Sequence, residues 1–113
     1  MTTDDNFASV RPFGFRAPRA STNFSFLVEV TSSGKQLQAV CTDISEDGLA
    51  ADMAEPLEPK TNLIIRMLLP GGTVPVQIPG SVEYCQDRRC GLTFLYSSPE
   101  DREQVRIFVQ SIS

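Results

Sequence analysis

The fold is decided by the stretch Thr42-Asp43-Ile44-Ser45-Glu46-Asp47-Gly48, which joins two apolar runs at 37–41 and 49–53. Its D-x-S-x-x-G spacing brings a carboxylate, a hydroxyl and a glycine into one tight turn between two strands. Asp43 and Ser45 can cap such a turn themselves, which is common for these residue types. Gly48 permits a positive φ and a close approach of the backbone. The turn can equally present its polar groups to a ligand, and both interpretations stay open from these residues alone.

Short apolar stretches on both sides of this turn predict a small β-barrel. Alternation of apolar and polar residues indicates half-buried strands. In the first of them, Phe24, Phe26 and Val28 share one face. In the second, we expect Ile44 to face away from Leu37. In the fifth expected strand, Pro79 has no backbone N–H to donate to a neighbouring strand, which predicts an edge strand or a bulged one. The expected strands cover 24–31, 37–44, 49–53, 62–69, 74–84 and 90–96.

The end of the chain changes to a helical period. Ser98 is a suitable N-cap and Pro99 suits the first helical position. An apolar face recurs at Val105, Phe108, Val109 and Ile112. We expect this face to pack on the open end of the sheet or on a partner. Six short strands with one C-terminal helix favour a closed, six-stranded antiparallel β-barrel over a sandwich.

Residues 1–22 show no periodic pattern and contain turn-forming proline and glycine, so we expect a flexible N-terminal arm followed by a barrel domain over 23–113. The segment 11–20 carries Arg11, Arg16 and Arg19 without any acidic residue, on a chain whose net charge is −4. That balance argues against binding of a nucleic-acid polymer and suits a compact anionic ligand. The alternative interpretation of the arm is a solvated, disordered tail.

Composition excludes several other classes of protein. No run of about 18 apolar residues is present, and the start of the chain lacks the features of a secretion signal, so we expect a cytoplasmic protein without membrane insertion. Histidine is absent and no catalytic constellation can be assembled, so we expect neither an enzyme nor a metal site. Cys41, Cys85 and Cys90 are expected to be reduced, although Cys85 and Cys90 could form a disulfide across a hairpin in an oxidising compartment.

The order and spacing of these motifs resemble the PilZ domain, a bacterial receptor module for cyclic di-GMP. The family's pattern is an R-x-x-x-R arm followed, a few tens of residues later, by [D/N]-x-S-x-x-G between two strands. The second motif is complete here, Arg19 is similar to the second arginine of the arm, and Gly91-Leu92-Thr93-Phe94 is similar to the final strand. The resemblance covers roughly residues 16–110. It implies the barrel with its terminal helix and cyclic di-GMP as the ligand, with no further cofactor.

One departure from the family pattern affects the ligand site. Phe15 stands where the first arginine is expected, and Arg16 gives R-x-x-R instead. An arginine can hold a phosphate through two donors and stack on guanine, and a carboxylate can accept from the guanine edge. The residues that the resemblance assigns to the ligand are Arg16, Arg19, Asp43, Ser45 and Gly48, with Arg11 and Phe15 as additional candidates.

Two functions therefore remain open. In the first, the chain is a receptor or adaptor that binds cyclic di-GMP, orders its arm on the barrel and signals to a protein partner not identified by the sequence. In the second, the loss of an arginine at Phe15 leaves a degenerate PilZ-like interaction module, whose helix face docks a partner or a second copy without nucleotide. We expect a monomer or a weak homodimer.

Overall fold

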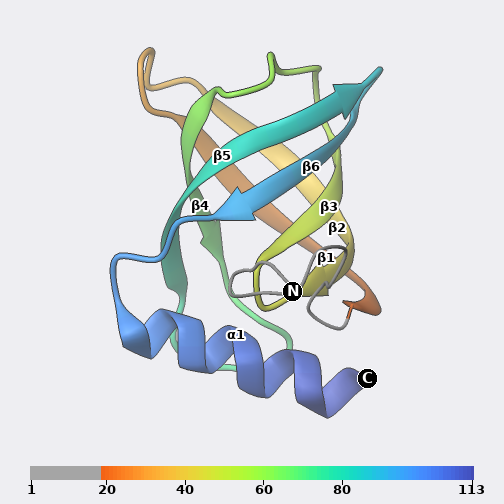
Figure 1. Ribbon diagram of the computed structural model, residues 1–113, viewed down its shortest axis with the longest axis vertical. Coiled ribbons are helices and arrows are strands. Elements are labelled where there is room, and N and C mark those ends of the chain that lie inside the picture. The colour runs from red at the N-terminus through yellow and green to blue at the C-terminus, as the bar shows by residue number, and fades with distance from the viewer. Residues whose placement is uncertain (1–18) are drawn as a thin grey trace, which may run out of the picture.

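The computed structural model describes residues 19–113, which form a closed six-stranded antiparallel barrel with one helix at its end (Figure 1). Around the barrel the strands follow the order β1-β2-β3-β6-β5-β4, and β4 pairs with β1 to close it. The expected fold class is thus confirmed. The elements are β1 (Arg19–Val30), β2 (Gln36–Ser45), β3 (Gly48–Met53), β4 (Asn62–Met67), β5 (Val76–Gln86), β6 (Arg89–Phe94) and α1 (Pro99–Ile112).

The first strand is longer than its alternation suggested. It begins at Arg19 rather than at residue 24, so the last four residues of the expected arm, 19–22, belong to β1. A register shift between Ser21 and Phe24 interrupts the β1–β2 pairing. The residues there are polar, so the alternation of apolar and polar residues does not reveal this part of the strand. The pairing resumes beyond the shift, with Arg19 opposite Ser45. The rest of the expected arm lies outside the described residues.

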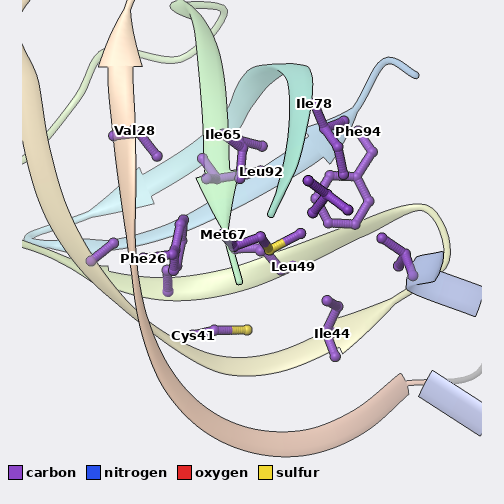
Figure 2. Close-up of a cluster of buried hydrophobic side chains, with 14 of the residues drawn as sticks. Phe26, Val28, Cys41, Ile44, Leu49, Ile65, Met67, Ile78, Leu92 and Phe94 are labelled. Carbon is purple, nitrogen blue, oxygen red and sulfur yellow. The ribbon is translucent and has the colours of Figure 1, made fainter. Parts of the chain in front are cut away.

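The barrel interior is filled by the inward-facing residues of all six strands. Val28, Leu49, Ile65 and Ile78 are almost completely buried, and Figure 2 shows side chains from different strands meeting in this core. The expected orientation of Ile44, away from Leu37, is wrong, because Ile44 is fully buried too. A register shift in the β2–β3 pairing between Cys41 and Asp43 breaks the alternation and turns Ile44 inward.

Closure of the barrel also decides between the two interpretations of the fifth strand. Pro79 lies opposite Ile64 of β4, inside a strand that has neighbours on both sides. The edge-strand interpretation is therefore wrong. The bulged interpretation is confirmed, because the β5–β6 register shifts between Val82 and Tyr84. Beyond this irregularity, β5 and β6 form a hairpin that projects away from α1 (Figure 1).

Helix α1 covers one end of the barrel and packs on β1, β2 and β5. Ser98 caps it, since its side chain accepts a hydrogen bond from the Asp101 backbone N–H. Of the expected apolar face, Val105, Phe108 and Val109 are buried, whereas Ile112 is exposed. Most of the face is thus used in packing on the chain's own barrel. Within residues 19–113, no helix has the length and apolar character needed to cross a membrane.

Candidate functional site

The first feature of the site is a carboxylate held between two arginines that are distant in sequence. Asp43 on β2 forms ion pairs with Arg19 at the start of β1 and with Arg89 at the start of β6. The Arg89 Nη2 atom lies 3.6 Å from Asp43 Oδ2, while Arg19 Nη1 contacts the other carboxylate oxygen. All three side chains are open to solvent, with exposed fractions of 26% for Asp43, 43% for Arg19 and 50% for Arg89. We call this group the Arg19–Asp43–Arg89 cluster.

The cluster stands at one end of a row of residues that face one another across four strands. Strand pairing sets Ser21 opposite Asp43, Asp43 opposite Ala50, Ala50 opposite Gly91, and Gly91 opposite Tyr84. Directly opposite residues share a face of the sheet, so these five line one strip of the barrel surface. A Cβ on Gly91 would lie 2.2 Å from the Tyr84 ring, so only glycine lets that ring lie over β6.

This strip sets an acidic side chain and an aromatic ring apart on one face of the sheet. Between the Asp43 carboxylate and the partly exposed Tyr84 ring lie Ala50 and Gly91, both of them buried, and the Tyr84 ring covers Gly91. A carboxylate accepts from paired N–H donors such as those of a guanine edge. The neighbouring guanidinium groups can hold phosphate oxygens or stack on a base.

Ser45 has a local role in the turn. It is buried, its Oγ accepts from the Asp47 backbone N–H at 3.2 Å, and it donates to the Gly48 carbonyl at 3.3 Å. A hydroxyl that already makes both bonds stabilises the turn shape. This geometry corresponds to the local alternative considered from the sequence.

Gly48 is required because two strands approach closely. A Cβ at this position would lie 2.2 Å from the Leu92 backbone oxygen of β6. The positive φ that glycine permits is not used at Gly48: among the described glycines, positive φ occurs at Gly34 and Gly71. The close approach that the motif predicted is present, but it is made by the β3–β6 backbone pairing.

Hydrogen bonds also connect the turn to helix α1 and to the segment that precedes this helix. Arg102 of α1 donates from Nε to Glu46 Oε2 at 2.6 Å, and the Tyr96 hydroxyl donates to the Glu46 carbonyl at 2.6 Å. Burial raises the pKa of Tyr96 above its usual range, so this donor keeps its proton at any physiological pH. Behind the turn, the Cys41 thiol donates to the Asp43 carbonyl at 3.4 Å. The position of Asp43 is therefore set by the rest of the fold.

Of the residues assigned from the sequence, the structure brings Arg19 and Asp43 together, and it places Ser45 and Gly48 at the two ends of the turn between β2 and β3. Arg11, Phe15 and Arg16 lie outside the described residues. Sequence reasoning missed Arg89, which pairs with Asp43, and Tyr84, which lies three strands away in the same row. The only local signal was the hairpin Gln86-Asp87-Arg88-Arg89, and nothing in that signal links it to Asp43. Between residues 19 and 113, no group of three His, Cys, Asp or Glu side chains is placed to hold a metal ion.

Comparisons with known proteins agree with this fold. The family model of the PilZ domain matches residues 15–111. Among solved structures, the chain is similar to one described as the crystal structure of the PilZ domain of CeSA from a cellulose-synthesizing bacterium, with a TM-score of 0.69 and 18% sequence identity. That match covers 84% of this chain and 97% of the other. A search of curated proteins finds no significant match. Because the family model spans most of the sequence, including the D-x-S-x-x-G turn, the chain belongs to the PilZ domain family.

Proposed function

We propose that the chain is a receptor for cyclic di-GMP and that it passes the signal to a protein partner in the cytoplasm. PilZ domains are in general ligand-binding modules of this kind and are not typically enzymes. The observation that carries the proposal is the Arg19–Asp43–Arg89 cluster, which presents a carboxylate and two guanidinium groups to solvent at the family motif. These groups match the guanine edges and phosphates of the ligand.

Binding would exchange one set of ionic contacts for another. Without ligand, Arg19 and Arg89 neutralise Asp43. An exposed ion pair contributes only about 0–1 kcal/mol, so releasing either arginine to a phosphate costs little. The released carboxylate can then accept from guanine, and charge-assisted hydrogen bonds to the ligand are roughly twice as strong as neutral ones. In this scheme Arg16 supplies a further guanidinium from the preceding segment, while Ser45 and Gly48 maintain the turn.

Calorimetric titration with cyclic di-GMP tests the proposal, with GTP and cyclic AMP as control ligands. We expect Arg19→Ala and Asp43→Ala each to weaken binding by about tenfold or more, the scale of one lost charge-assisted hydrogen bond. Arg66→Ala is the matched control, because Arg66 on β4 is exposed to the same degree as Arg19 and pairs with Glu29 at 3.0 Å. This control should bind normally. Equal titration curves for all three variants would refute the assignment of the site.

The second candidate function is the degenerate module that does not bind nucleotide. Phe15 in place of the first arginine is the observation in its favour. Absence of binding heat for the wild-type protein, with the fold verified by circular dichroism, would select this function. The search should then turn to protein partners. Most of the apolar helix face is already packed on the barrel, so that face offers them mainly Ile112, while the exposed Ile107 lies on the other side of the helix.

A further inference from the structure

The β5–β6 hairpin contains a pair of cysteines in disulfide contact. Cys85 and Cys90 are directly opposite each other in the ladder, with their Cα atoms 4.1 Å apart, and the structure joins them by a disulfide. Cys90 is fully buried and Cys85 is partly exposed, so only Cys85 is open to a reagent in solution. Cys41 is a poor competitor for oxidation, because burial raises the pKa of its thiol to about 12.

The two cysteines are adjacent in sequence to the residues that line the candidate site. Arg89, which pairs with Asp43, precedes Cys90, and Gly91 follows it. Tyr84, whose ring covers Gly91, precedes Cys85. The bond between the cysteines therefore sits at the base of a short turn, where β5 has just been disturbed by the register shift between Val82 and Tyr84.

A disulfide that closes a short loop removes less conformational entropy from the unfolded chain than one that closes a long loop. Its main effect is therefore on the local structure of the hairpin. Beyond it, the hairpin is held by the Gln86–Arg89 pair and by the Met53 N–H, which donates to the Arg88 carbonyl at 2.7 Å. In a reducing cytoplasm a disulfide of this kind is typically transient and redox-sensing. These features indicate that the disulfide acts as a reversible switch of the hairpin and argue against a role in stabilising the whole fold.

We propose that Cys85 and Cys90 form a reversible thiol–disulfide switch that sets the position of Arg89 and Tyr84 at the candidate site. The oxidant is a small-molecule disulfide such as oxidised glutathione. The Cys85 thiolate attacks one of its sulfurs, which forms a mixed disulfide and releases one thiol. The Cys90 thiolate then attacks the Cys85 sulfur and releases the second thiol. The protein thus loses two electrons and two protons, and the small disulfide gains them. Reduction runs the same exchange backwards with a dithiol.

The first test of the switch needs no nucleotide. Protein equilibrated with oxidised or reduced glutathione is denatured and labelled with a maleimide. We expect only Cys41 to be labelled after oxidation and all three cysteines after reduction. Backbone amide NMR of the two forms should show changes at Asp43 and Ala50 as well as at the hairpin. Labelling of all three cysteines in both buffers, or amide changes confined to 85–90, would overturn the inference.

The second test rests on the proposed function, because it uses cyclic di-GMP as the probe. We expect the oxidised protein to bind roughly tenfold more tightly than the reduced one, since the closed hairpin keeps Arg89 at the site, where its guanidinium can pass from Asp43 to a phosphate. Cys85→Ser should bind like the reduced form in either buffer, and Cys41→Ala should keep the redox response. Equal affinity in both forms would contradict the switch. Absence of binding in both forms would contradict the proposed function alone, because the NMR test of the switch still stands.

Discussion

At the scale of single residues, two glycines are required for different physical reasons. Gly34, in the turn between β1 and β2, has φ of +74°, and nothing lies within 4 Å of the Cβ that another residue would add. Gly48 has no positive φ, but its added Cβ would meet the Leu92 carbonyl oxygen. The first site restricts backbone conformation, whereas the second restricts space between two strands.

Replacement of each glycine by asparagine separates these two causes. Asparagine tolerates the left-handed conformation better than most residues, so Gly34→Asn should lower the free energy of unfolding by less than about 1 kcal/mol. Gly48→Asn must push β3 from β6, and we expect a loss of about 3 kcal/mol or failure to fold, the upper end of overpacking effects. Urea unfolding measures both variants. Similar losses at the two positions would contradict this assignment of causes.

At the scale of elements, α1 closes the barrel through one face only. Phe108 is buried and its ring lies edge-on to Phe24 of β1, with 5.9 Å between ring centroids. Ile107, the preceding residue on the same helix, is 54% exposed. The helical period thus places two large apolar neighbours in opposite environments, and the contribution of the helix to stability should come from the Phe108 side.

We expect Phe108→Ala to lower the free energy of unfolding by about 3 kcal/mol or more, because it leaves a cavity between helix and barrel. Ile107→Ala is the matched control and should change it by less than about 0.5 kcal/mol. Thermal unfolding followed by circular dichroism measures both. If Ile107→Ala were as costly as Phe108→Ala, the exposed side of α1 would have to be covered in solution by a partner or a second copy.

At the scale of the whole molecule, the buried Cys41 couples stability to alkaline pH. Burial, followed by the charge of Asp43, raises the pKa of its thiol from 9.0 to about 12. Between these two values the unfolded chain releases the proton and the folded chain keeps it. The unfolded state is therefore favoured progressively as the pH rises above about 9.

For the oxidised protein, in which Cys85 and Cys90 do not titrate, the Cys41 contribution should reduce the free energy of unfolding by up to about 1.4 kcal/mol per pH unit between pH 9 and pH 12. Cys41→Ala should remove this contribution, most clearly between pH 9 and pH 10, where the buried Tyr96 does not yet add its own, while lowering stability at neutral pH through the cavity it leaves. Urea unfolding at several pH values measures both effects. An unchanged slope in Cys41→Ala would show that another group, such as Tyr96, dominates.

The sequence by itself determined the elements of this protein and the family motif. Alternation located the first two strands, because one face of each is buried, and short apolar runs between turn residues located the strands at 49–53 and 62–69. The cap at Ser98 and the spacing of Val105, Phe108 and Val109 located the helix for the same reason. These signals are local: each depends on residues a few positions apart. The link between Arg19 and Asp43 came from the family's spacing, and the barrel brings the two side chains into contact.

Only the tertiary structure decided which residues of other strands complete the candidate site. Arg89 reaches Asp43 and Tyr84 covers Gly91 because β6 pairs with β3 on one side and β5 on the other, an arrangement that no local pattern encodes. Register shifts near Phe24, Cys41 and Val82 likewise changed strand starts and faces, since a single extra residue reverses the alternation from which they are inferred. Long-range pairing and bulges are therefore the physical reason that the site could be only half assembled from sequence.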